Sequence, residues 1–123
     1  MGGTLYIVGT PIGNLADFSR RAEATLKSVD LIACEDTRVS RKLLNHYHIQ
    51  TPLISYHNHN ERSQTEKLIG RLKLGENIAL ISDAGTPCIS DPGYRLVHSA
   101  RKLEVQVITI PGPSAVPAAL SIS

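Results

Sequence analysis

Five short runs of apolar, strand-forming residues alternate with amphipathic stretches along this sequence, and no other feature limits the fold as strongly. The runs occupy residues 5–8, 31–34, 52–56, 78–81 and 105–110. Strands separated by helices are typical of βαβ units, which build a mostly parallel sheet with helices on both faces. We therefore expect an α/β fold, with a mostly parallel five-stranded sheet flanked by helices.

Each amphipathic stretch repeats its apolar residues at the spacing of a helix. The four faces expected to be buried are Ala22, Leu26 and Val29; Val39, Leu43 and Tyr47; Thr65, Leu68 and Leu72; and Leu96, Ala100 and Leu103. Gly75 follows the third stretch, as the C-terminus of a helix prefers. Asp91 and Pro92 mark the start of the fourth helix, because Asp caps well and Pro suits the first turn. Ser114 can cap a last helix.

The composition excludes several classes of protein. The chain has 123 residues, of which 41% are hydrophobic and 20% charged, so disorder, collagen and coiled coil are excluded. The net charge of +2 is too small to indicate nucleic-acid binding by itself. No apolar run approaches the ~20 residues of a membrane span, and no basic leader precedes residue 5. We expect a protein of the cytoplasm, without contact to a membrane.

The sequence ends soon after the last expected helix begins. From Ala115 to Ser123 there are about nine residues, which is short for a helix that must cover a sheet. We expect residues 1–123 to be a truncated N-terminal domain, with a C-terminal domain absent. The alternative is a complete small domain whose terminal helix frays.

Loops of interest leave the carboxyl ends of four expected strands. Right-handed crossovers place all such loops along one edge of a parallel sheet, and ligands of open α/β sheets bind at that edge. Four of these loops carry residues suited to chemistry: 9–14, 35–38, 82–87 and 111–115. We expect the functional site there.

Three of these loops suit a nucleotide-like ligand. Loop 9–14 joins a strand to a helix but matches neither GxxxxGK[ST] nor GxGxxG, so it is equally consistent with a tight turn. Gly85 permits a close approach of the backbone to a ligand, and Asp83 could meet a ribose hydroxyl, an amine or a sulfonium, or only cap a turn. Residues 111–115 offer the N–H groups of a helix start to an anion, or form a rigid turn.

Loop 35–38 is the most highly charged of the four. Glu35 and Asp36 are adjacent carboxylates, which can move a proton or bind a cation. Arg38, Arg41 and Lys42 share one face of the helix that follows. That face could contact phosphates, or it could simply be solvated.

Four histidines, at positions 46, 48, 57 and 59, raise the question of a metal site, together with Cys34 and Cys88. An H-x-H pair can chelate. Yet no carboxylate or cysteine stands at zinc-motif spacing among them, so we expect no metal. A histidine pair that contacts a polar substrate, or that lies on the surface, is the better interpretation.

Six segments in order carry a family resemblance: LYIVGTPIGNL at 5–15, EDTR at 35–38, HNHNE at 57–61, SDAGTP at 82–87, SDPG at 90–93 and PGPSA at 111–115. The sequence resembles the tetrapyrrole-methylase-like superfamily of S-adenosylmethionine (SAM) methyltransferases over essentially its whole length. Within that superfamily it is similar to the bacterial branch that methylates a cytidine ribose 2′-hydroxyl of 16S rRNA.

The resemblance implies a two-domain enzyme that binds SAM in the cleft between its domains and forms a homodimer. It implies that one half of the cofactor site consists of Ile12, Asp83, Gly85, Thr86, Ser114 and Ala115. It also implies a substrate side drawn from Thr10, Pro11, Asn14, Glu35, Asp36, Arg38, His57 and His59. The partner would be 16S rRNA or the small ribosomal subunit, recognised by shape and local contacts.

In the reaction implied by the resemblance, the ribose oxygen attacks the methyl group of SAM. Much of the lowering of the barrier can come from orientation. A general base would add a factor of about 10²–10⁴, and the candidates are Asp36, Glu35 and His57, among which the sequence does not choose. Two alternatives stay open: a tetrapyrrole C-methyltransferase of the same superfamily, and a non-catalytic nucleotide-binding α/β module.

Overall fold

The computed structural model describes residues 2–9, 19–57, 59–82 and 91–110. In these ranges the strands are β1 (Thr4–Gly9), β2 (Leu31–Cys34), β3 (Leu53–Ser55), β4 (Ile78–Ser82) and β5 (Gln106–Ile110). The helices are α1 (Arg20–Ser28), α2 (Thr37–His46), α3 (Glu61–Lys73) and α4 (Asp91–Lys102). The five predicted strands and the first four predicted helices are confirmed, while the helix expected from Ser114 lies outside the described residues.

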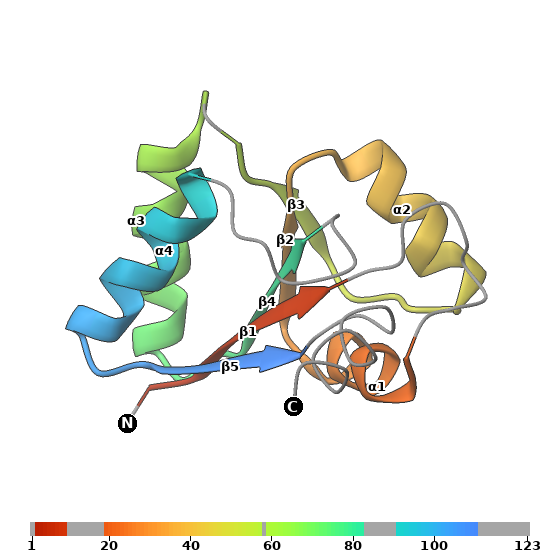
Figure 1. Cartoon of the computed structure of the whole chain (residues 1–123), viewed down its shortest axis with the longest axis horizontal. Coiled ribbons are helices and arrows are strands. Elements are labelled where there is room, and N and C mark those ends of the chain that lie inside the picture. Colours follow the sequence, from red (N-terminus) through yellow and green to blue (C-terminus); the bar gives the residue numbers. More distant parts are fainter. Residues whose placement is uncertain (1, 10–18, 58, 83–90, 111–123) are drawn as a thin grey trace, which may run out of the picture.

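The strands form one sheet in the order β3-β2-β4-β1-β5, and every pair of neighbours is parallel. Helices cover both faces, with α1 and α2 on one side and α3 and α4 on the other (Figure 1). The chain changes face after β3, where its crossovers reverse direction along the sheet. Right-handed crossovers require this change of face.

Two apolar cores lie between the sheet and its helices. Leu5, Ile7 and Leu80 belong to the core under α3 and α4, whereas Val8 and Ile81 belong to the core under α1 and α2. Successive side chains of a strand point to opposite faces, so the continuous apolar runs of β1 and β4 supply both cores. This explains why the sequence shows unbroken runs rather than alternation.

The predicted buried face of α2 is partly wrong. Val39 is 59% exposed, and Ser40 and Leu44 are buried with Leu43. The buried positions are spaced i, i+3 and i+4, so the inward face is rotated from the one expected at 39, 43 and 47. Leu103 is also 46% exposed, because α4 ends at Lys102, before that residue.

One residue, Asn77, links three parts of the sheet at the edge where the strands begin. Asn77, just before β4, accepts a hydrogen bond at Oδ1 from the backbone N–H of Thr4 in β1, at 2.8 Å. The backbone N–H of Asn77 donates to Oδ2 of Asp30, just before β2, also at 2.8 Å. The amino edge of β1, β2 and β4 is therefore fixed by direct hydrogen bonds.

All five strands end at the opposite edge. Gly9 is paired with Ser82, Val8 with Ile110 and Cys34 with Ser55. The crossovers that follow β1 and β4 run in opposite directions along the sheet. Adjacent strands with this property mark the place where open α/β sheets bind ligands.

Candidate functional site

The predicted site residues divide into two groups. Glu35, Asp36, Arg38, His57 and His59 are described by the structure. The remaining ones lie outside the described residues: Thr10, Pro11, Ile12, Asn14, Asp83, Gly85, Thr86, Ser114 and Ala115. The geometry of the site is therefore built from the first group.

A hollow of about 440 Å³ lies at the carboxyl ends of β2 and β3 and is lined by Glu35, Asp36, Thr37, Arg38, Ser55 and His57. Its two walls come from segments about twenty residues apart, which the parallel pairing of Cys34 with Ser55 brings together. The loop after β2 supplies the carboxylates, and the loop after β3 supplies the imidazole. The structure places His57 and residues 35–38 around one hollow at this edge.

Asp36 is the N-cap of α2. Its Oδ1 accepts a hydrogen bond from the backbone N–H of Arg38 at 2.9 Å, and the Arg38 guanidinium lies 3.5 Å from the same atom. These contacts, with the backbone hydrogen bond the largest, hold the pKa of Asp36 below its ordinary value. A carboxylate stabilised in its charged form is a weaker base. Asp36 therefore suits a structural and electrostatic role better than proton abstraction.

Glu35 differs from its neighbour although both line the hollow. Its side chain is exposed, and none of the described residues donates a hydrogen bond to it or pairs with it. It belongs to no helix, since it lies between the end of β2 and the cap of α2. Of the two adjacent carboxylates, Glu35 is the one that keeps its proton-accepting oxygens available.

His57 is held in one orientation by the turn that precedes α3. Its ring Nδ1 accepts a hydrogen bond from the backbone N–H of His59 at 3.1 Å. Its own backbone N–H donates to Oδ1 of Asn60 at 2.9 Å. A neutral imidazole that accepts at Nδ1 carries its proton on Nε2. His57 can therefore donate a hydrogen bond from Nε2 to a ligand oxygen.

His59 does not line the same hollow. It lines a neighbouring one of about 290 Å³ at the start of α3, together with residues 60–63. Its ring stands edge-on to that of His57, with the centroids 5.7 Å apart. The structure thus brings His59 beside the predicted site, where its backbone orients His57.

The residues that support His57 are not evident from the sequence pattern. Asn60 precedes α3 but makes no side-chain cap, because its amide is turned back toward β3. Its Nδ2 donates to the carbonyl oxygen and to Oγ of Ser55, both at 3.2 Å, and Gln64 donates to the same carbonyl at 2.9 Å. The sequence signal that could have indicated this role is an Asn directly before a helical stretch. That residue was interpreted only as part of the HNHNE motif.

Arg38 projects from the rim of the hollow, with its side chain 91% exposed. Arg41 and Lys42 are exposed on the same helix. The three cations therefore face solvent in the first turns of α2, and Arg38 lies beside Asp36. An arginine and two carboxylates around one hollow suit a substrate that carries both phosphates and hydroxyl groups.

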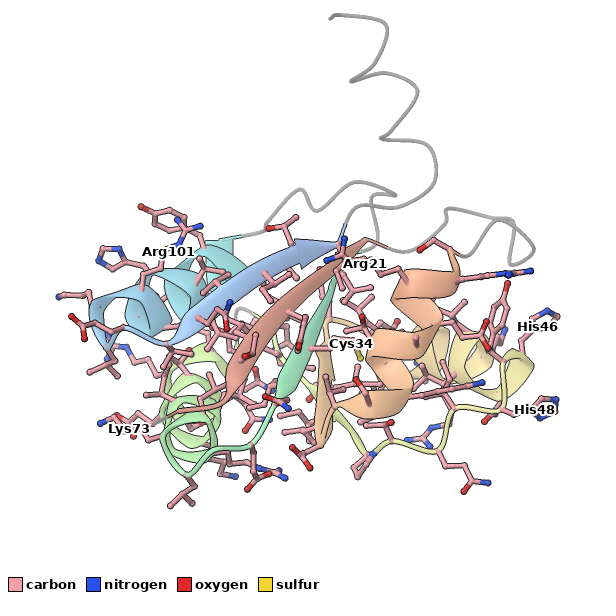
Figure 2. All side chains as sticks on the ribbon, turned by 90° about the horizontal axis from the view of Figure 1, so that it is seen from below. Arg21, Cys34, His46, His48, Lys73 and Arg101 are labelled. Carbon is pink, nitrogen blue, oxygen red and sulfur yellow. The ribbon has the colours of Figure 1, made fainter. Side chains whose placement is uncertain are left out.

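Within the described ranges, the histidines and Cys34 do not gather into a metal centre. No three His, Cys, Asp or Glu side chains within the described ranges lie close enough together to hold an ion. Cys34 is buried in the core between the sheet and α1, whereas His46 and His48 point away from the sheet (Figure 2). Cys88 lies outside the described residues. Among the described helices, none has the length and apolar character needed to cross a membrane.

Several curated proteins similar to this chain carry the name "Ribosomal RNA small subunit methyltransferase I". The relative from Synechocystis sp. is 57% identical over 118 residues, which cover 96% of this chain and 42% of that protein. The relative from Xylella fastidiosa is 55% identical and that from Escherichia coli O157:H7 is 54% identical, with 98% and 97% of this chain covered. The chain spans less than half the length of these relatives, 44% and 42% for the last two.

Solved structures share the fold at low sequence identity. The uroporphyrin-III-C-methyltransferase of Thermus thermophilus matches with a TM-score of 0.70 and 19% identity, over 89% of this chain and 46% of that one. A diphthine synthase matches with a TM-score of 0.72 and 16% identity, over 89% and 44% of the two chains.

A family model matches nearly the whole sequence, over residues 4–123. The chain therefore belongs to the tetrapyrrole (corrin/porphyrin) methylase family.

Proposed function

We propose that this chain is the N-terminal domain of a SAM-dependent methyltransferase that modifies a cytidine ribose 2′-hydroxyl of 16S rRNA. The observation that carries the proposal is the 54–57% identity, over nearly all of this chain, to relatives named ribosomal RNA small subunit methyltransferase I. Because those relatives are more than twice as long, we propose a second domain beyond these residues. The chain joined to that domain is named the two-domain protein below.

The cofactor half-site that we propose consists of Ile12, Asp83, Gly85, Thr86, Ser114 and Ala115. The support comes from the strands that precede these residues. β4, β1 and β5 are consecutive in the sheet, and their last residues lie at one edge. When bound, SAM supplies a sulfonium-activated methyl group. A carboxylate such as that of Asp83 and the N–H groups of a helix start suit the amine, ribose and carboxylate of such a ligand.

The hollow at β2 and β3 is the part of the substrate side that the described residues form. We propose that His57 donates from Nε2–H to an RNA oxygen and that Arg38 contacts a phosphate. Glu35 is the carboxylate whose oxygens are available to take the proton of the 2′-hydroxyl. Asp36 keeps α2 in place and remains charged. A general base at this position would raise the rate of methyl transfer by a factor of about 10²–10⁴.

The experiment is methyl transfer to small ribosomal subunits that lack the 2′-O-methyl group. The two-domain protein is incubated with SAM and these subunits, and the modified nucleotide is located by mass spectrometry of the 16S rRNA. Asp83→Asn is expected to reduce both SAM binding and transfer. The matched control is Asp30→Asn, because Asp30 lies at the amino edge and Asn keeps an oxygen that can accept from Asn77. Transfer to a porphyrinoid instead of rRNA would contradict the proposal.

The tetrapyrrole alternative has weaker support than the rRNA one. The structural likeness to the uroporphyrin-III-C-methyltransferase comes at 19% identity and speaks for the fold alone. A non-catalytic nucleotide-binding module is the second alternative, and SAM titration by calorimetry discriminates it, since such a module would give no heat with SAM. We also propose that the two-domain protein is a cytoplasmic homodimer. Light scattering measures its mass in solution and so tests for a dimer.

A further inference from the structure

The outer side of α4 carries aromatic and basic residues and no acidic one between positions 94 and 102. Its inner side packs Leu96, Val97 and Ala100 into the core. The exposed positions are Tyr94, Arg95, His98, Arg101 and Lys102. Tyr94, His98 and Arg101 stand at i, i+4 and i+7, so they share one face, with Lys102 beside them. These four residues are named the α4 stripe.

Tyr94 is exposed in a way that packing does not explain. Its side chain is 63% exposed, whereas Tyr56 is buried and Tyr6 and Tyr47 are half-buried. The Tyr94 ring is stacked on that of His98, with an angle of 14° between the planes and 6.0 Å between the centroids. The imidazole thus supports a flat aromatic surface that faces solvent. Such surfaces bind the bases of single-stranded nucleic acids.

The charges along the stripe are not neutralised within the described part of the protein. Arg95 turns toward α3, where its Nε lies 3.2 Å from Oε2 of the half-buried Glu61. Arg101 and Lys102 have no acidic partner within 4 Å among the described residues. Their position in the last turn suits the helix dipole, but this does not account for Tyr94 in the first turns. An aromatic surface in line with unpaired cations is complementary to RNA.

The stripe extends from the edge that carries the site. α4 follows β4, which ends at the carboxyl edge, and leads into the parallel β5, so Tyr94 lies in the half of α4 nearer that edge (Figure 1). Seven residues of helix separate Tyr94 from Arg101, about 10 Å along the axis. Figure 2 places Arg101 on α4, with Lys73 on the neighbouring α3.

We propose that the α4 stripe binds single-stranded RNA of the substrate, with one base stacked on Tyr94 and neighbouring phosphates at Arg101 and Lys102. The inference rests on the proposed function, since it extends the same substrate over a second surface. It adds a contact that the hollow at β2 and β3 does not provide. Arg101 and Lys102 would supply positive charge locally, although the net charge of the chain is only +2.

The test measures binding of a fluorescein-labelled, cytidine-rich 12-nucleotide RNA to the 123-residue chain by anisotropy. Tyr94→Leu is expected to weaken binding at least about fivefold, because stacking on a ring is lost. Tyr94→Phe retains the ring and is expected to stay within twofold. Arg101→Gln with Lys102→Gln is expected to lower the slope of log affinity against log salt by about 1.4, the value for two contacts to a single strand.

The matched control is Lys67→Gln with Lys73→Gln, which removes the same charge from exposed positions of α3. All variants are compared for thermal melting and for mass by light scattering. The proposal is overturned if the parent chain does not bind the RNA, if Tyr94→Leu binds as the parent does, or if the α3 control lowers the slope equally. A change of mass in Tyr94→Leu without a change in RNA binding would overturn it too, because the stripe would then join two copies of the chain.

Methyl transfer by the two-domain protein separates this inference from the proposed function. If the parent protein methylates rRNA and the Tyr94→Leu variant does so with an unchanged KM for rRNA, RNA binding by the α4 stripe is refuted. The proposed methyltransferase function is then unaffected. If the chain binds RNA through Tyr94 but the two-domain protein methylates no rRNA, the proposed methyltransferase function is refuted. RNA binding by the α4 stripe is then still supported.

Discussion

The backbone N–H of His59 lies 3.1 Å from Nδ1 of His57 and donates a hydrogen bond to it. This contact occupies Nδ1 and leaves Nε2–H of the neutral ring as a donor, and His57 lines the hollow. The relationship turns a candidate base into a candidate binding group. It can be tested by replacing the imidazole with groups that keep or lose a donor.

His57→Ala in the two-domain protein is expected to lower kcat/KM for rRNA by about tenfold, the value of one hydrogen bond. His57→Gln retains an N–H donor and should recover most of that loss. A histidine donor does not act as the base, so the acid limb of the pH profile should persist in both variants. Steady-state measurements of kcat/KM as a function of pH test this prediction. Disappearance of the acid limb in the His57→Gln variant would show that His57 is the general base.

Asp36 should stabilise the fold in a pH-dependent way. Its pKa is held low in the folded state by the N–H of Arg38, so its contribution is present above the ordinary Asp value of about 3.9. That contribution is lost as the pH falls through the lowered folded pKa. Asp36→Ala should therefore be less stable than the parent at pH 7, and the difference should shrink below about pH 4. Urea denaturation at both pH values measures it, with Asp36→Ser as a control that retains a cap.

Tyr56 and Thr65 form a buried hydroxyl pair at 2.7 Å beneath the start of α3. Burial raises the pKa of Tyr56, so this hydroxyl stays protonated at any physiological pH. Tyr56→Phe is expected to cost about 1–3 kcal/mol, because the Thr65 hydroxyl loses that partner in the core. The double variant Tyr56→Phe/Thr65→Val should cost less than the sum of the two single variants. Additive free energies of unfolding would contradict this coupling.

Two glycines should respond to alanine in opposite directions. A Cβ on Gly3 would overlap the carbonyl of Glu76, so Gly3→Ala must displace backbone and should cost at least about 1–3 kcal/mol. Gly70 lies inside α3 with open space around its Cα, so Gly70→Ala should stabilise by about 0.5–1 kcal/mol. Thermal melting of the two variants against the parent checks both. Equal effects of the same sign would show that local backbone packing does not decide them.

The 123-residue chain alone should bind SAM weakly. If the complete pocket binds with a Kd near 1 µM, half of that free energy corresponds to a Kd of about 1 mM. Calorimetry on the chain and on the two-domain protein compares the two values. Micromolar binding by the chain alone would contradict a cofactor site shared between two domains.

The sheet could be predicted because its signals are local. β2 and β4 are continuous apolar runs bounded by polar residues, and the structure places them in the middle of the sheet, buried on both faces. The parallel arrangement followed from the alternation with helices. The order of the strands in the sheet could not be predicted in this way, because no local sequence pattern indicates which strands become neighbours. That order is what puts Cys34 beside Ser55 and so creates the hollow.

The candidate site was predicted by position better than by role. The sequence placed the 35–38 loop at the correct edge, but it did not reveal that Asp36 caps α2 and has a lowered pKa. Asp36 stands directly before an amphipathic stretch, which is a signal for a helix N-cap. Because Glu35 is adjacent, the pair was interpreted as candidates for proton transfer instead. The role of Asn60 depends on contacts with Ser55 across a turn. Periodicity cannot show such contacts.

The hydrogen bonds of Asn77 to β1 and to the start of β2 have a consequence for how this scaffold diversifies. They brace the sheet at the edge opposite the candidate site. Loops at the opposite end can therefore exchange residues or change length with little effect on strand register. Such a separation of bracing from the loops lets one sheet carry loops of different sequence and length.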